Sequence, residues 1–160
     1  MWYNTFTMEK KLTFTTEVKE EICSHEFTNK ELLAILSGFC KVNGILTLSS
    51  NGMALNLKTE NSKIAKMIYT TFKSLFDVTP NYTYSKKMKF DKGSVFHINI
   101  VEKTNEILET LELMKDGMPS YPQNIVKEEG LRYFIIGAFL ASGSVNSPSS
   151  KNYHLQMVVF

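Results

Sequence analysis

The sequence predicts an α+β fold in which helices pack against an antiparallel four-stranded sheet. Segments with helical periodicity alternate along the chain with pairs of short strands joined by turn residues, and this order favours an antiparallel sheet over a parallel one. A nine-residue segment also occurs twice, each time at the end of a helix. The 160 residues are 43% hydrophobic and 12% aromatic. That is enough apolar material for the core of one ordinary domain or two small ones.

Composition excludes several classes of function. The net charge of +2, from 18 basic and 16 acidic residues, is too small to predict nucleic-acid binding from bulk charge, so any basic surface must be local. Cys23 and Cys40 lie in apolar, helix-like sequence without the spacing of a zinc site, and are expected to be reduced core thiols. The first seven residues lack the basic and apolar regions typical of a signal peptide, and the sequence given contains no apolar run of about 20 residues. We expect a cytoplasmic protein with no membrane partner, no cofactor and no metal.

Capping residues predict the first two helices. Thr15 or Thr16 can cap a short helix that ends at Cys23. Thr28 and Glu31 have the spacing of a capping box, which begins a helix over residues 29–42. Asn43 and Gly44 then end that helix, where Gly44 can adopt left-handed backbone angles.

Two β-hairpins and a third helix follow. Each hairpin alternates apolar and polar residues on either side of a glycine-containing turn, Ser50-Asn51-Gly52 in the first and Asp91-Lys92-Gly93 in the second. The expected strands are residues 45–49, 53–58, 81–90 and 94–100. Between the hairpins, Asn61 opens a helix with one apolar face, which Pro80 ends.

The remaining elements suggest a domain boundary and a second unit. A helix from Thr104 is expected to stop at Asp116-Gly117, and a short helix over residues 122–129 and a long one over 131–142 follow. A final strand over residues 152–160 has no later partner. The expected division is an N-terminal tail over 1–14, a first repeat over 15–117 and the start of an incomplete second repeat over 118–160.

The internal repeat consists of residues 36–44 and 135–143, which align without a gap. The glycine at its third position, Gly38 or Gly137, would let two helices approach closely, and the glycine at its end, Gly44 or Gly143, would let the chain turn sharply into a sheet. The ordinary reading of these glycines is helix packing.

These repeats resemble the LAGLIDADG motif of homing endonucleases. The segments 13–21, 58–61, 86–89, 137–146 and 153–155 resemble the WhiA family of bacterial regulators. The resemblance implies a degenerate LAGLIDADG-like portion followed by a helix-turn-helix that binds promoters, with roles in sporulation gene control, cell division and chromosome segregation. This chain is expected to stop inside its second repeat, before the helix-turn-helix.

Nuclease chemistry is not expected. In the nucleases that the motif resembles, an acid before each final glycine holds the divalent ions that activate water. Asn43 and Ser142 stand at those positions, and Lys41 and Leu140 fill the other acidic position of each motif. A neutral amide and a hydroxyl are poor ligands for a hard cation. The chain is therefore predicted not to be an enzyme, and an active DNA endonuclease ranks last among its possible functions.

One face of the predicted sheet is polar and basic. Lysines concentrate between residues 81 and 103, and period-two alternation separates the polar side chains of the strands from the apolar ones. By resemblance to the nucleases, this face is expected to contact the phosphates of DNA. The candidate residues are Lys58, Lys86, Lys87, Lys89, His97, Asn99 and Asn56. The alternative is that they form the solvated face of a half-buried sheet, and Lys86 breaks the alternation.

The function predicted from the sequence is that of a non-catalytic, nucleoid-associated regulator of the WhiA type. It acts in cell division, chromosome segregation or sporulation gene control, and its partners are double-stranded DNA and other regulatory proteins. The alternative function is a protein-interaction platform that does not itself bind DNA. Charge reversal at Lys58, Lys87 and Lys89 would discriminate the two, because only the first function requires these lysines to contact phosphates.

Overall fold

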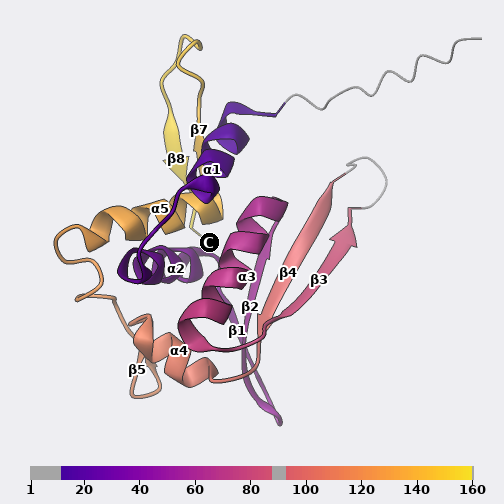
Figure 1. The fold of residues 1–160 in the computed structure, drawn as a ribbon, viewed down its shortest axis with the longest axis vertical. Coiled ribbons are helices and arrows are strands. Elements are labelled where there is room, and N and C mark those ends of the chain that lie inside the picture. The colour runs from indigo at the N-terminus through magenta and orange to yellow at the C-terminus, as the bar shows by residue number, and fades with distance from the viewer. Residues whose placement is uncertain (1–11, 88–92, 160) are drawn as a thin grey trace, which may run out of the picture.

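The computed structural model describes residues 12–87 and 93–159 and has the predicted α+β architecture (Figure 1). Four strands form one antiparallel sheet in the order β1-β2-β4-β3, and β5–β6 and β7–β8 form two short antiparallel pairs. The elements are α1 (Phe14–Ser24), α2 (Asn29–Asn43), β1 (Ile45–Ser49), β2 (Gly52–Thr59), α3 (Ser62–Phe76), β3 (Asn81–Lys86), β4 (Ser94–Ile100), α4 (Thr104–Thr110), β5 (Met114–Lys115), β6 (Met118–Pro119), α5 (Gly130–Ser142), β7 (Gly143–Val145) and β8 (Leu155–Met157).

The two faces of the main sheet differ in the way that the alternation predicts. Leu57 pairs with Ile98, and both side chains are buried on the face that the helices cover. The next pair along the same two strands, Lys58 and His97, projects to the opposite face and is exposed. Because the side-chain period of a strand is two, a register shift of one residue would exchange the two faces, so the buried leucines and isoleucines determine which residues face outward.

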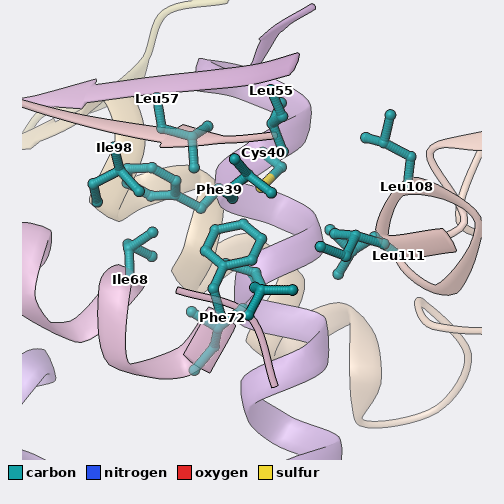
Figure 2. Close-up of a cluster of buried hydrophobic side chains, with 14 of the residues drawn as sticks. Phe39, Cys40, Leu55, Leu57, Ile68, Phe72, Ile98, Leu108 and Leu111 are labelled. Atoms are coloured by element: carbon teal, nitrogen blue, oxygen red, sulfur yellow. The ribbon is translucent and has the colours of Figure 1, made fainter. Parts of the chain in front are cut away.

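The core lies between this sheet and helices α2 and α3 (Figure 2). Phe39 of α2 and Phe72 of α3 are at most 1% exposed and meet the inward-facing strand residues. Cys40 is buried in the same cluster, and burial raises the pKa of its thiol. Cys23 is half-buried, and burial, together with the charge of Glu20, raises its thiol pKa to about 11. Neither thiol is therefore ionised at neutral pH.

The predicted capping box is present at the start of α2. The Thr28 N–H donates to the Glu31 carboxylate at 2.9 Å, and the Glu31 N–H donates to the Thr28 hydroxyl at 3.3 Å. The predicted cap of α1 is wrong: Thr13 caps this helix by accepting from the Thr16 N–H at 3.2 Å. Thr15 lies inside the helix, and its hydroxyl bonds to β7 instead.

Helices α2 and α5, which carry the two repeated segments, pack directly against each other. A Cβ atom on Gly38 would lie 1.9 Å from the Phe134 carbonyl oxygen, and one on Gly137 would lie 1.9 Å from the Ile35 carbonyl oxygen. The two motif helices therefore approach each other closely at these two glycines, and the contact is reciprocal.

Gly44, at the end of the first repeat, does not adopt the predicted left-handed backbone, and its counterpart Gly143 is extended as well. Gly44 has φ −69° and Gly143 has φ −73°, both extended. Glycine is required at these positions because a side chain would have no room. A Cβ on Gly44 would lie 2.5 Å from the Cys40 carbonyl oxygen, and one on Gly143 would lie 2.0 Å from the Phe139 ring.

The segment between the two repeats differs from the prediction. Helix α4 ends at Thr110 and not near residue 116, because the chain reverses at Glu112, whose φ is 56°. The turn at Asp116-Gly117 instead joins the short strands β5 and β6. Residues 123–129 form turns, so the short helix predicted there is wrong. Helix α3 ends at Phe76, since Asp77 is left-handed with φ 52°, before Pro80 is reached.

The last strand is shorter than predicted and has a partner. Only Leu155–Met157 of the expected 152–160 form β8, and they pair antiparallel with β7, directly after the second motif helix. The second repeat therefore places a strand after its helix, as the first does with β1.

The Glu112 side chain stabilises the turns between α4 and α5 by hydrogen bonds. Its carboxylate accepts hydrogen bonds from the N–H groups of Asn124 and Ile125, at 2.9 and 3.1 Å, and from the Asn124 side chain at 2.8 Å. Burial alone would raise the pKa of this carboxyl, but the bonds from Ile125 and Asn124, together with the charge of Lys127, lower it below its usual value.

We expect Glu112→Gln to reduce the free energy of unfolding at pH 7 by about 1 kcal/mol, since a charge-assisted acceptor is replaced by a neutral one. The folded-state pKa is lowered, so the ionised carboxylate stabilises the fold above the usual value of 4.5 and this stabilisation is lost as pH falls through the lowered value. Urea denaturation between pH 3 and 7 should show the two proteins converging at acid pH. A difference that stays constant down to pH 3 would contradict the assignment.

Residues 12–87 and 93–159 include no helix with both the length and the apolar character that crossing a membrane requires.

Candidate functional site

A chain of side-chain amides crosses the exposed face of the main sheet. Asn81 of β3 donates to Asn99 of β4 at 3.5 Å, Asn99 donates to Asn56 of β2, and Asn56 donates to the Thr47 hydroxyl of β1 at 3.1 Å. All four strands contribute one residue. Every bond runs in the same direction, so the orientation of each amide is set by its neighbours.

A second row lies beside the amides on the same face. Lys58 of β2 is opposite His97 of β4, which is in turn opposite Thr83 of β3. The Ser85 hydroxyl lies 3.2 Å from His97 Nε2. Lys58 is exposed, and none of the ion pairs among the described residues involves it. Its ammonium group is therefore available to an anion above the sheet.

Lys86 and Lys87 differ from Lys58, the first in the side of the sheet on which it lies and the second in its ion pair. Lys86 lies on the same side of β3 as Tyr84, opposite to the amides, as the break in alternation indicated. Lys87 forms an ion pair with Glu60, whose carboxylate oxygen is 2.7 Å from its Nζ. Lys89 falls outside the described residues. Within residues 12–87 and 93–159, the basic character of the amide face therefore rests on Lys58, with His97 beside it.

The two positions that correspond to nuclease acids lie at the ends of the packed motif helices. The Asn43 side-chain oxygen accepts the backbone N–H of Lys58 at 2.9 Å, which ties the end of α2 to β2. The Ser142 hydroxyl is buried without a hydrogen-bond partner. Neither residue presents an anionic oxygen.

Sequence analysis missed some of the polar residues. Asn81, Thr83 and Ser85 alternate along β3 in phase with the amide face, so period-two alternation alone could have identified them. It could not have identified Lys19 of α1, which lines the same cleft as Asn43 at the end of the motif helices. That placement depends on where α1 packs, and no local pattern encodes it.

Both repeats match known families. Residues 29–114 match the family described as the WhiA N-terminal LAGLIDADG-like domain, and residues 131–159 match the WhiA LAGLIDADG-like domain.

Relatives extend the match over most of the chain. It is 37% identical over 150 residues to the probable cell division protein WhiA of Anoxybacillus flavithermus, which covers 91% of this chain and 46% of that protein. The corresponding protein of Staphylococcus carnosus is 34% identical over 149 residues, covering 91% and 48%. The chain thus spans about half the length of the curated relatives it matches. A crystal structure of the N-terminal LAGLIDADG domain of WhiA has a TM-score of 0.65 at 20% identity, covering 92% of this chain and 67% of that one.

Proposed function

This chain belongs to the WhiA family, and from that premise we propose that it is a non-catalytic regulatory protein that binds double-stranded DNA with the amide face of its main sheet. The relatives are named as probable cell division proteins, so we propose that the chain regulates cell division. Chromosome segregation and sporulation gene control are the further processes in which we propose that it acts. The observation that carries the proposal is the chain of amides from Asn81 to Thr47, with Lys58 beside it.

The dimensions of the amide face suit a groove of DNA. Neighbouring strands lie about 4.8 Å apart, so the row across four strands is about 14 Å wide, close to the roughly 12 Å width of the major groove. Asparagine can donate to and accept from one base edge at once, and adenine offers the matching pair of groups. Because the amides already orient one another, little side-chain entropy is lost when they meet DNA.

Lys58 supplies the charge that such contacts need. A lysine above a sheet positions the protein by contacting phosphates and carries no sequence information itself. His97, directly opposite, adds ring nitrogens that can form hydrogen bonds. Lys58 and His97 would contact the phosphates, and the amides would contact the bases.

The donor set supports a non-catalytic role. Asn43 and Ser142 replace the acids that would hold divalent ions, and the Asn43 oxygen is already engaged by the Lys58 N–H. In the described part of the chain, no three His, Cys, Asp or Glu side chains are grouped so that they could hold a metal ion. A fold that resembles a nuclease does not carry nuclease activity without such a site.

Fluorescence anisotropy with a labelled duplex, titrated with salt, tests the DNA contact. Each phosphate that the protein neutralises should add about −0.9 to the slope of log K against log[salt]. Lys58→Ala should make the slope shallower by about one unit and weaken binding on every sequence. Lys66→Ala, an exposed lysine on α3, is the matched control and should leave the slope unchanged.

Two results would contradict the proposal. Absence of binding at low salt by a folded sample would favour the protein-interaction platform. Magnesium-dependent nicking of the duplex would indicate an endonuclease, which is not expected because Asn43 and Ser142 replace the acids that would hold the metal ions.

A further inference from the structure

A cleft of about 710 Å³ lies where the ends of the two motif helices meet α1, β2 and the start of α3. Cavities of this size hold small molecules such as nucleotides. Its lining includes Lys19, Asn43, Lys58, Glu20, Glu60 and Lys87. The cleft is separate from the amide row, although Lys58 borders both.

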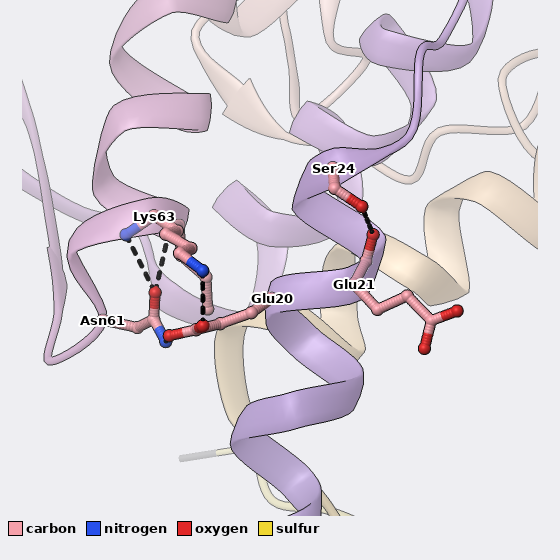
Figure 3. A network of polar contacts seen from close by, with 6 residues as sticks. Glu20, Glu21, Ser24, Asn61 and Lys63 are labelled. Atoms are coloured by element: carbon pink, nitrogen blue, oxygen red, sulfur yellow. Dashed lines mark hydrogen bonds and ion pairs between the residues drawn. The ribbon is translucent and has the colours of Figure 1, made fainter. Parts of the chain in front are cut away.

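Helix α1 forms one wall of the cleft and is anchored on two sides. The Thr15 hydroxyl donates to the Val145 carbonyl at 3.0 Å and accepts from the Val145 N–H at 2.9 Å. On the other side, the Glu20 carboxylate bonds to Lys63 at 2.7 Å and to the Asn61 side chain at 3.2 Å, as Figure 3 shows. A duplex is far larger than the space behind this wall, so the cleft favours a small ligand.

Among the charged and amide side chains that line the cleft, the groups left open are donors. The Asn43 oxygen accepts the Lys58 N–H, which fixes the side-chain amide, and its NH₂ group has no acceptor among the residues that the structure describes. Both acids are already paired at 2.7 Å, Glu20 with Lys63 and Glu60 with Lys87.

Lys19 has no carboxylate partner among the described residues. The residue is half-buried, and its ammonium group lies 5.5 Å from the centre of the Phe139 ring. Burial lowers the pKa of Lys19, because a desolvated ammonium without a counter-ion is unfavourable. An anion bound beside it would remove that penalty.

We propose that this cleft binds a small phosphorylated molecule of nucleotide size, held by Lys19, Lys58 and the Asn43 NH₂ group. At the position where the resembling nucleases hold cations, the open groups here are two ammonium groups and an amide donor, which attract an anionic oxygen and repel a metal ion. Binding there would give the protein an effector site beside its sheet. This inference goes beyond the proposed function and does not depend on it.

Calorimetric titration with pyrophosphate and with ADP, in magnesium-free buffer at constant ionic strength, tests the site. We expect saturable binding of one molecule per chain, and about tenfold weaker binding by Lys19→Gln, because one charge-assisted hydrogen bond is lost. Lys73→Gln, an exposed lysine of α3 outside the cleft, should bind as tightly as the wild type. Lys19 is not on the amide face, so Lys19→Gln should leave duplex binding unchanged.

An isosteric variant keeps the test independent of folding. Asn43→Asp can still accept the Lys58 N–H, so it should fold, but it replaces the donor by an anion and should abolish pyrophosphate binding. Thermal unfolding followed by circular dichroism would verify that each variant is folded. The proposal is overturned if neither probe saturates, or if folded Lys19→Gln and Asn43→Asp bind like the wild type. It is also overturned if Lys19→Gln weakens duplex binding as much as pyrophosphate binding, since the phosphates that Lys19 contacts would then come from DNA.

Discussion

Gly38→Ala is expected to lower the free energy of unfolding by about 3 kcal/mol or more, the upper range for overpacking a core. The new Cβ would lie 1.9 Å from the Phe134 carbonyl oxygen and 3.1 Å from the Ala138 nitrogen. Both atoms belong to the backbone of α5, so no side chain can rotate away and the two helices must separate. Helix propensity predicts the opposite sign, because alanine is favoured over glycine within a helix by about 1 kcal/mol.

Urea denaturation followed by circular dichroism measures this effect. Lys30→Ala, an exposed position on the same helix, is the control and should change stability by less than about 0.5 kcal/mol. Gly137→Ala should cost as much as Gly38→Ala, since its Cβ would meet the Ile35 carbonyl oxygen at the same distance of 1.9 Å. The double variant should cost less than the sum, because helices separated by the first substitution accommodate the second. A Gly38→Ala protein as stable as the wild type would show that α2 and α5 are not in backbone contact.

Phe72→Ala is expected to lower the free energy of unfolding by about 3–5 kcal/mol. Part of this loss is the transfer free energy of the removed ring, and part comes from the cavity left behind. The Phe72 side chain is 0% exposed and lies at the centre of the cluster in Figure 2, between α2 and the sheet. The neighbouring strands and helices are held by the backbone and by other buried side chains, so they can relax only in part. Against a typical domain stability of about 5–15 kcal/mol, this loss leaves a marginally folded protein.

Phe76→Ala provides a matched comparison on the same helix. Phe76 is one turn further along α3 and is only partly buried, with its ring centre 6.2 Å from that of Phe72. Removing the Phe76 ring should lower the free energy of unfolding by clearly less, about 1–2 kcal/mol. The variant removes less buried apolar surface, and water can enter the space left behind. Chemical denaturation of both variants at pH 7 would measure the difference. Equal losses would mean that Phe72 is not at the centre of the core.

The sequence by itself determined the elements whose signals are local. The capping box at Thr28, the turn at Gly52 and the alternation along β2 and β4 each involve residues within a few positions of one another. The sequence also indicated the role of the repeated glycines, because small residues at the same place in two helices favour close packing of those helices. These signals were sufficient for the fold class and for the polar face that contains Asn56, Lys58, His97 and Asn99.

Only the tertiary structure decided how these elements meet. The bond between Thr15 and Val145 joins residues 130 apart in sequence, and it sets one wall of the cleft. The pairing of Lys87 with Glu60, and the direction of the amide chain across four strands, likewise follow from packing. The early end of α4 has the same origin, since the left-handed turn at Glu112 is held by bonds to the backbone of Asn124 and Ile125. Periodicity and caps report on neighbours in the chain, whereas these contacts form only once distant segments are brought together by burial of the core.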